Sequence, residues 1–203
     1  MYKRQHPHGV EDAYAALRWM HDTAAAEFDF PADRTAVAGE SGGGGIAAGL
    51  TLLARDRAEY GVSAQFLLYP MLDDRTGTSA EPDPMPYAGE FMWTARSNTF
   101  AWNAVLEQHA GASTVPALAA PARALDLTGL PPTWIVVGSL DLFVGEDLRY
   151  ARTLVRSGVA TELHVYPGAY HAFISFAQEA DVSVRASNEF VGALTRHFST
   201  PPA

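Results

Sequence analysis

A serine in a glycine-rich turn is the first residue of the chain that could carry out covalent chemistry. Residues 39–43 read Gly-Glu-Ser-Gly-Gly, the Gly-x-Ser-x-Gly pattern that holds a serine on a sharp turn between a strand and a helix. We expect Gly39 and Gly43 to leave room for the two elements to pass close together. Ser41 would then project from the carboxyl edge of a sheet, where its hydroxyl can attack a carbonyl carbon once a base takes its proton.

A glycine-rich turn after a strand also has other uses. Its helix N-terminus can bind a phosphate, and a run of glycines can be purely structural. A P-loop needs a lysine after its last glycine, and the dinucleotide-binding pattern needs a glycine where Glu40 or Ser41 stands. The nucleophile is therefore the favoured interpretation, and a structural glycine turn is the alternative.

An acid and a base follow two later strands of the chain. Asp141 comes shortly after a strand predicted over 133–138, and His171 comes shortly after a strand predicted over 161–166. In a serine-histidine-aspartate triad, the histidine takes the proton of the serine while the acid orients the imidazole. Taken singly, Asp141 could cap the next helix and His171 could be a packed loop residue. Their joint placement after strands favours a triad with Ser41.

The elements that would position these residues alternate along the chain. Apolar runs and helical periodicity predict strands at about 35–39, 65–69, 133–138 and 161–166, and helices at about 10–24, 42–60, 94–109, 146–157 and 182–198. Strands separated by helices predict an α/β fold, a parallel sheet with helices on both faces. Ligands of such sheets bind at the carboxyl ends of the strands.

We interpret residues 1–203 as a single domain with one irregular region. Residues 71–92 carry several prolines and acids, which is typical of a surface excursion, and Thr94 can cap the helix that follows. Within this region, Asp73 and Asp74 are interpreted as turn residues rather than as a second pair of active-site acids. The segment 71–110 is expected to lie near the active site.

Composition limits the classes of function. The chain has 203 residues, a formal charge of −9 and no cysteine, which argues against a nucleic-acid or anionic-membrane surface and excludes thiol chemistry. His6 and His8 are interpreted as solvated loop residues rather than a metal pair, so we expect no metal and no cofactor. Without a predicted membrane span or signal peptide, a cytoplasmic location is the default expectation.

The chain resembles the bacterial hormone-sensitive-lipase-like (family IV) carboxylesterases of the α/β-hydrolase superfamily. The similar stretches are EDAYAALRW at 11–19, VAGESGG at 37–43, LLYP at 67–70, GLPP at 129–132 continuing to Asp141, and VYPG at 165–168 continuing through HAF at 171–173. The resemblance implies an esterase that cleaves a small-molecule carboxylic ester through an acyl-enzyme. It implies Ser41 as the nucleophile, Asp141 as the acid, His171 as the base, and the backbone N–H of Gly42 as an oxyanion donor.

The chain also departs from the family pattern. Leu142-Phe143 stands where the family usually has Pro-Leu, and no His-Gly-Gly-Gly run occurs upstream of Ser41. We therefore expect an α/β-hydrolase-type sheet with only the later four strands present, in a chain truncated at its N-terminus, and weak turnover. The strand at 35–39 would be a bare edge, so residues 1–9 are expected to cover it unless the chain forms a homo-oligomer or aggregates.

Three other functions remain open from the sequence. A prolyl-oligopeptidase-like peptidase domain shares the serine turn and the order of the triad. A non-catalytic ligand-binding protein, such as the plant gibberellin receptors, shares the scaffold but lacks the catalytic histidine, and His171 is present here. A weakly active remnant could keep the triad without its oxyanion loop.

Overall fold

A parallel sheet of four strands forms the centre of the molecule. The computed structural model describes residues 5–199, and its sheet contains β1 (Val37–Glu40), β2 (Gln65–Leu68), β3 (Thr133–Gly138) and β4 (Thr161–Tyr166). The strands lie in the order β1-β2-β3-β4, and every neighbouring pair is parallel. The predicted α/β class and its four parallel strands are confirmed.

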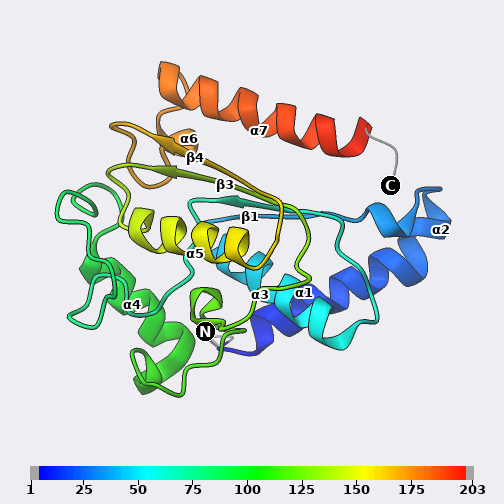
Figure 1. Ribbon diagram of the computed structural model, residues 1–203, viewed down its shortest axis with the longest axis horizontal. Helices are drawn as coiled ribbons and strands as arrows, with labels where there is room; N and C mark the ends of the chain where they lie inside the picture. Colours follow the sequence, from blue (N-terminus) through cyan, green and yellow to red (C-terminus); the bar gives the residue numbers. More distant parts are fainter. Residues whose placement is uncertain (1–4, 200–203) are drawn as a thin grey trace.

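Helices cover both faces of this sheet (Figure 1). The helices are α1 (His8–Trp19), α2 (Ala25–Glu27), α3 (Gly42–Arg57), α4 (Ala95–Leu106), α5 (Val144–Arg156), α6 (Phe173–Phe176) and α7 (Asp181–Ser199). Alternate strand residues face opposite ways, as a strand requires. Phe66 and Val136 belong to the cluster packed against α7, whereas Leu67 and Ile135 belong to the cluster shared with α3 and α5.

The helix boundaries differ from the predicted ones by a few residues. The first predicted helix is confirmed, although a π-helical turn at Met20–Ala24 joins α1 to α2. The hydroxyl oxygen of Thr94 accepts a hydrogen bond from the Ser97 N–H at 3.3 Å, so the predicted cap of α4 is confirmed. Within 5–199, no helix is long and apolar enough to cross a bilayer.

The start of the proline-rich region is buried, which corrects the sequence interpretation. Asp73 and Asp74 do lie in a turn, as predicted, since the Asp73 carbonyl accepts the Thr76 N–H at 3.2 Å. They are nevertheless only 0% and 3% exposed, and they hold ion pairs. Asp73 pairs with Arg75 and Arg149, and Asp74 pairs with Arg123. Burial would raise the pKa of Asp73, but the Arg75 hydrogen bonds and the Arg149 charge outweigh it and hold the pKa below its usual value.

Strand β1 lies at the edge of the sheet, as predicted, and pairs only with β2 among the described residues. The prediction that residues 1–9 cover this edge is not met by residues 5–9, which lie beside helices instead. The His6 N–H donates to the Val105 carbonyl of α4 at 3.1 Å, and Gly9 lies next to Ile46 of α3. Residues 1–4 are outside the described part of the chain.

Candidate active site

The predicted nucleophile lies on a strained turn between β1 and α3. Ser41 has φ 55° and ψ −122°, a conformation that costs a non-glycine residue about 1–3 kcal/mol and persists only where its surroundings fix it. Backbone hydrogen bonds fix it on two sides. The Ser41 N–H donates to the Leu68 carbonyl at 2.9 Å, and its carbonyl accepts from the Met71 N–H at 2.9 Å.

Glycines allow this turn, but not all of them are the predicted ones. A Cβ at Gly39 would lie 2.3 Å from the Gly43 carbonyl oxygen, so the requirement for glycine at 39 is confirmed. The prediction for Gly43 is wrong, because a Cβ there would meet nothing within 4 Å. The close contacts are instead at Gly44, against Pro70, and at Gly45, 2.3 Å from the Met71 carbonyl oxygen.

The structure brings the three predicted triad residues together at the carboxyl ends of their strands. Ser41 Oγ lies 2.9 Å from His171 Nε2, and His171 Nδ1 lies 2.9 Å from Asp141 Oδ2. The other oxygen of Asp141 accepts the Phe143 N–H at 3.0 Å. With Nδ1–H donated to the carboxylate, Nε2 is left to accept the serine proton. Asp141 is 0% exposed and His171 is 5% exposed.

The loop after β3, which carries Asp141, and the loop after β4, which carries His171, are joined directly by a hydrogen bond. The Leu140 N–H donates to the Ala169 carbonyl at 2.9 Å. A Cβ at Gly138 would lie 2.2 Å from that same carbonyl oxygen, so only glycine lets the loop after β4 approach the end of β3. This contact fixes the separation of Asp141 and His171.

Gly42 is the first residue of α3, next to the serine. Amides in the first turn of a helix have no acceptor within their own helix, so the Gly42 N–H can donate to an oxygen bound at Ser41. No group of three or more His, Cys, Asp or Glu residues suited to holding a metal occurs within 5–199. The arrangement is suited to nucleophilic attack and proton transfer by side chains.

Three aromatic rings surround His171, in contacts that the sequence did not predict. The ring centroids of Phe143, Tyr69 and Trp93 lie 5.0, 5.2 and 5.8 Å from that of His171. The Tyr69 hydroxyl donates to Glu40 at 2.8 Å, and burial raises the pKa of Tyr69. Two of the rings had a signal in the sequence, because Tyr69 stands just after a buried strand and Phe143 belongs to the Leu142-Phe143 departure from the family pattern.

A buried chain of hydrogen bonds holds Trp93 against the histidine. The indole N–H of Trp93 donates to Asn98 Oδ1 at 3.2 Å, and Asn98 Nδ2 donates to the Thr76 carbonyl at 2.8 Å. The Thr76 hydroxyl donates to Glu146 of α5, whose carboxylate also accepts the Leu72 N–H. Asn98 is fully buried. These hydrogen bonds thus connect three parts of the structure behind the candidate site: α4, the segment after β2, and α5.

Asn98→Leu should therefore disturb the site without touching the triad. Leucine fits a similar volume but leaves the Thr76 carbonyl and the Trp93 indole unpaired, which costs about 1–3 kcal/mol of unfolding free energy. A displaced Trp93 would no longer hold His171, and small misplacements lower turnover by up to about 10²-fold. Ester hydrolysis across pH and thermal unfolding measure both effects. Asn103→Leu, at an exposed position on α4, is the matched control, and equal rates in the two variants would contradict the role of Asn98.

A second buried acid on α5, Asp147, has no hydrogen-bond partner among residues 5–199. Neither carboxylate oxygen of Asp147 has a hydrogen-bond partner in the part of the chain that the structure describes. Burial, and then the charges of Glu146 and Asp141, raise the pKa of Asp147 well above its usual value. The folded protein therefore holds this proton to a higher pH than the unfolded chain, and stability falls as pH rises between the two pKa values.

Asp147→Leu should accordingly stabilise the protein. Leucine has a branched side chain of similar shape, and it removes an unpaired buried polar group. The free energy of unfolding should therefore rise by about 1–3 kcal/mol. The gain should be larger at pH 8 than at pH 4, because only at the higher pH does folding hold the carboxyl group in a protonated state that the unfolded chain has lost. Urea unfolding at both pH values measures the difference. A destabilised variant at pH 8 would show that Asp147 has a partner.

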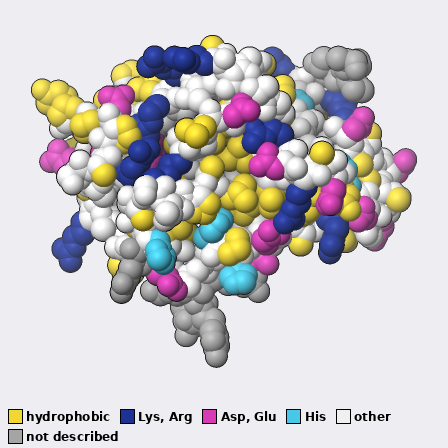
Figure 2. All heavy atoms as spheres, turned by 60° about the horizontal axis from the view of Figure 1, so that its bottom comes forward, with side chains coloured by type: hydrophobic (Ala, Val, Ile, Leu, Met, Phe, Trp, Pro, Cys, Tyr) yellow, Lys and Arg dark blue, Asp and Glu magenta, His cyan; other side chains and the backbone are white. Residues whose placement is uncertain are grey.

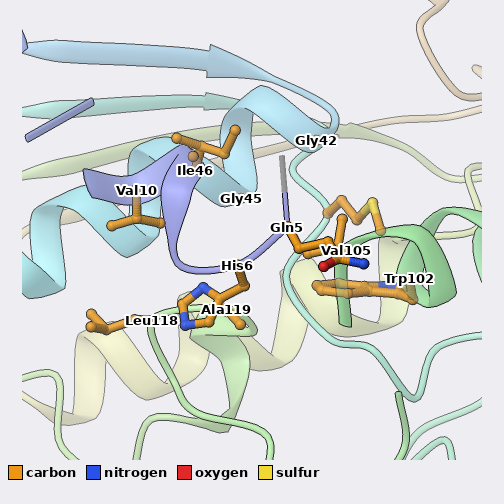
Figure 3. Close-up of a pocket in the computed structure, with 12 residues that line it drawn as sticks. Gln5, His6, Val10, Gly42, Gly45, Ile46, Trp102, Val105, Leu118 and Ala119 are labelled. Carbon is orange, nitrogen blue, oxygen red and sulfur yellow. The ribbon is translucent and has the colours of Figure 1, made fainter. Parts of the chain in front are cut away.

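An apolar cavity of about 200 Å³ opens beside Gly42 (Figure 3). Its walls come from the first turns of α3, from α4 and from the segments around residues 6 and 118. His6 lies in this wall and is partly buried, so it is less solvated than expected, and burial lowers its pKa despite the opposing charge of Glu11. On this side of the molecule, hydrophobic side chains gather at the centre of the surface with histidines beside them (Figure 2).

The chain is similar to known proteins. A family model described as alpha/beta hydrolase fold matches residues 3–175. Carboxylic ester hydrolase LipN of Mycobacterium tuberculosis is 35% identical over 198 residues, covering 95% of this chain and 51% of LipN. Carboxylesterase NlhH of the same species is 33% identical, covering 94% of this chain and 59% of NlhH.

The fold is also similar to that of a solved esterase structure. The bacterial heroin esterase superposes with a TM-score of 0.87 at 38% identity, covering 96% of this chain and 61% of that structure. The chain thus spans between about half and three fifths of the length of these proteins.

Proposed function

The chain belongs to the α/β-hydrolase superfamily, in its hormone-sensitive-lipase-like (family IV) branch, and from this premise we propose that it is a serine hydrolase of small carboxylic esters. The observation that carries the proposal is the line of two 2.9 Å contacts from Ser41 through His171 to Asp141. The esterase names of the similar proteins support the same reaction.

In the proposed reaction, the triad works in two halves. His171 takes the proton of Ser41 as Oγ attacks the ester carbonyl carbon, and the new oxyanion accepts the Gly42 N–H. The imidazolium, stabilised by Asp141, then gives its proton to the leaving alcohol, which leaves an acyl group on Ser41. A water molecule, activated by His171 in the same way, releases the carboxylic acid and restores the serine.

The preference for an ester over a peptide substrate rests on the similar proteins, since both reactions use this triad. Gly42 is the one oxyanion donor that we assign among the described residues, and loss of one such donor typically lowers turnover by about 10²–10³-fold. The weak turnover expected from the sequence therefore stays a prediction. The loss of turnover should be smallest for aryl esters, because their leaving groups need little protonation.

Covalent labelling tests the proposal directly. A fluorophosphonate probe should react with the protein, and peptide mapping should place the adduct on Ser41. Ser157→Ala, which removes a serine at the end of α5, is the control and should label normally. Hydrolysis of p-nitrophenyl acetate without cleavage of prolyl peptides would separate an esterase from a peptidase. An unlabelled protein with no hydrolysis would instead favour a non-catalytic ligand-binding protein.

A further inference from the structure

The residue that precedes the predicted nucleophile accepts two hydrogen bonds on one oxygen. Glu40 is the last residue of β1 and is joined directly to Ser41. Its Oε1 accepts the Tyr69 hydroxyl at 2.8 Å and the Ser175 hydroxyl at 2.9 Å. Hydrogen bonds to a carboxylate are roughly twice as strong as those between neutral groups, so this one oxygen can hold both hydroxyl groups in place.

Both hydroxyl groups belong to segments that position the histidine. The Tyr69 ring lies edge-on to the His171 ring, with 5.2 Å between the centroids and 70° between the planes. Ser175 lies on α6, the short helix that follows His171 in the chain. Glu40 therefore reaches the imidazole by two routes, through the ring that contacts it and through the helix that comes after it.

The helix after the histidine depends on contacts with other segments. Ala172, directly after His171, has φ 59°, in the left-handed region that a residue with a side chain seldom adopts. A helix as short as α6 is not stable by itself in water. Phe173 is buried and holds one side of this helix. On the exposed side, the bond from Ser175 to Glu40 holds it to the serine turn.

The ring of Tyr69 is held at both ends. Its side chain is fully buried, and its backbone has φ 36°, a strained conformation that persists only where the surroundings fix it. A buried tyrosine usually needs a hydrogen-bond partner for its hydroxyl group, and the carboxylate of Glu40 provides one. The bond at the far end of the ring therefore helps to keep its edge against His171.

We propose that Glu40 is a positioning residue of the esterase, which accepts both hydrogen bonds and thereby keeps His171 at the serine hydroxyl. The proposal rests on the esterase function proposed above and adds to it a residue that acts through others. Because Glu40 is covalently joined to Ser41, its side chain fixes the loop that carries His171 relative to the nucleophile itself. The distance that it maintains is the 2.9 Å contact from Ser41 Oγ to His171 Nε2.

Glu40→Ala should lower kcat for p-nitrophenyl acetate by about 10- to 10²-fold, because a small misplacement of the imidazole is enough to slow proton transfer. KM should change by less than about twofold, since Glu40 does not line the cavity beside Gly42. The rates are measured below the thermal midpoint of each variant, on protein whose circular dichroism spectrum matches that of the wild type. A loss of stability alone would not change kcat under these conditions.

Glu40→Gln is the conservative variant that should restore the activity. The amide oxygen of glutamine can accept both hydroxyl groups in the same place, so kcat should stay within about fivefold of the wild type. Glu179→Ala, which removes an exposed acid from the segment after α6, controls for the loss of one negative charge and should behave as the wild type. A Glu40→Gln variant as slow as Glu40→Ala would overturn the proposal.

A double-mutant cycle tests whether Glu40 acts through the two hydroxyl groups. Tyr69→Phe combined with Ser175→Ala removes both donors and should lower kcat about as much as Glu40→Ala does. Adding Glu40→Ala to that protein should lower kcat by less than about twofold more, because its partners are already absent. Effects that multiply as if the sites were independent would overturn the proposal.

Hydrogen exchange separates this proposal from the esterase function. The amides of residues 170–177 should exchange about tenfold faster in Glu40→Ala than in the wild type, and Glu40→Gln should exchange as slowly as the wild type. If the wild type cleaves no ester but this exchange pattern holds, the proposed function fails and the anchoring by Glu40 stands. If the wild type is an esterase and Glu40→Ala keeps both its kcat and its slow exchange, the assignment of Glu40 alone is overturned.

Discussion

Ser41→Ala should lower the hydrolysis of p-nitrophenyl acetate by roughly 10⁴- to 10⁶-fold, the usual cost of removing a triad nucleophile. The effect is this large because alanine leaves His171 with no hydroxyl to deprotonate, and no acyl-enzyme can form. Steady-state rates measured at several enzyme concentrations, together with loss of fluorophosphonate labelling, detect the change well outside experimental error.

The substitution should leave the fold in place, which keeps this experiment interpretable. Alanine also has to adopt the positive φ of Ser41, so the strain of the turn is unchanged, and the backbone bonds to Leu68 and Met71 do not involve the side chain. The circular dichroism spectrum should match that of the wild type. Labelling or turnover that survives in Ser41→Ala would show that another residue is the nucleophile.

Asp141→Asn should lower turnover by roughly 10⁴-fold while the protein stays folded. The asparagine amide can donate to His171 Nδ1, which favours the tautomer with its proton on Nε2. That tautomer cannot accept the serine proton. The rate of p-nitrophenyl acetate hydrolysis measures the loss, and the remaining activity should rise with pH as hydroxide replaces the missing base.

Asp147→Asn is the matched control, because it makes the same change at a buried acid close to Asp141 that has no hydrogen bond to the histidine. Its turnover should stay within a few-fold of the wild type. Glu146→Gln provides a second comparison, since Glu146 bonds to Leu72 and Thr76 rather than to His171. A fully active Asp141→Asn beside an inactive Glu146→Gln would show that the acid is wrongly assigned.

The sequence was sufficient where local pattern and chain order determine structure. Each of the four strands is a short run rich in apolar or β-branched residues and followed by glycine, proline or a polar turn, and parallel strands bring their carboxyl ends to one edge. Ser41, Asp141 and His171 each follow such a strand, so their proximity could be predicted without any knowledge of side-chain contacts. Their catalytic roles stay a proposal.

The sequence was insufficient where contacts depend on the path of irregular segments. Trp93 and Asn98 meet His171 and Thr76 only because residues 71–92 fold back over the site, and no periodicity describes that path. The same limitation hid the burial of Asp73, since packing brings its partner Arg149 to it from α5. At the serine turn, the pattern named Gly43, but the close contacts depend on where Pro70 and Met71 pass.

The order of the strands has a consequence for how the chain folds during synthesis. Because β1, β2, β3 and β4 pair in the order in which they are made, each new strand can add to the sheet as it leaves the ribosome, without waiting for a later segment to be inserted between earlier ones. Sequential growth of this kind keeps contacts comparatively local for a parallel sheet. Ser41 is therefore positioned early, whereas His171 arrives after the last strand, so a nascent chain would acquire its complete triad only in the final stage of folding.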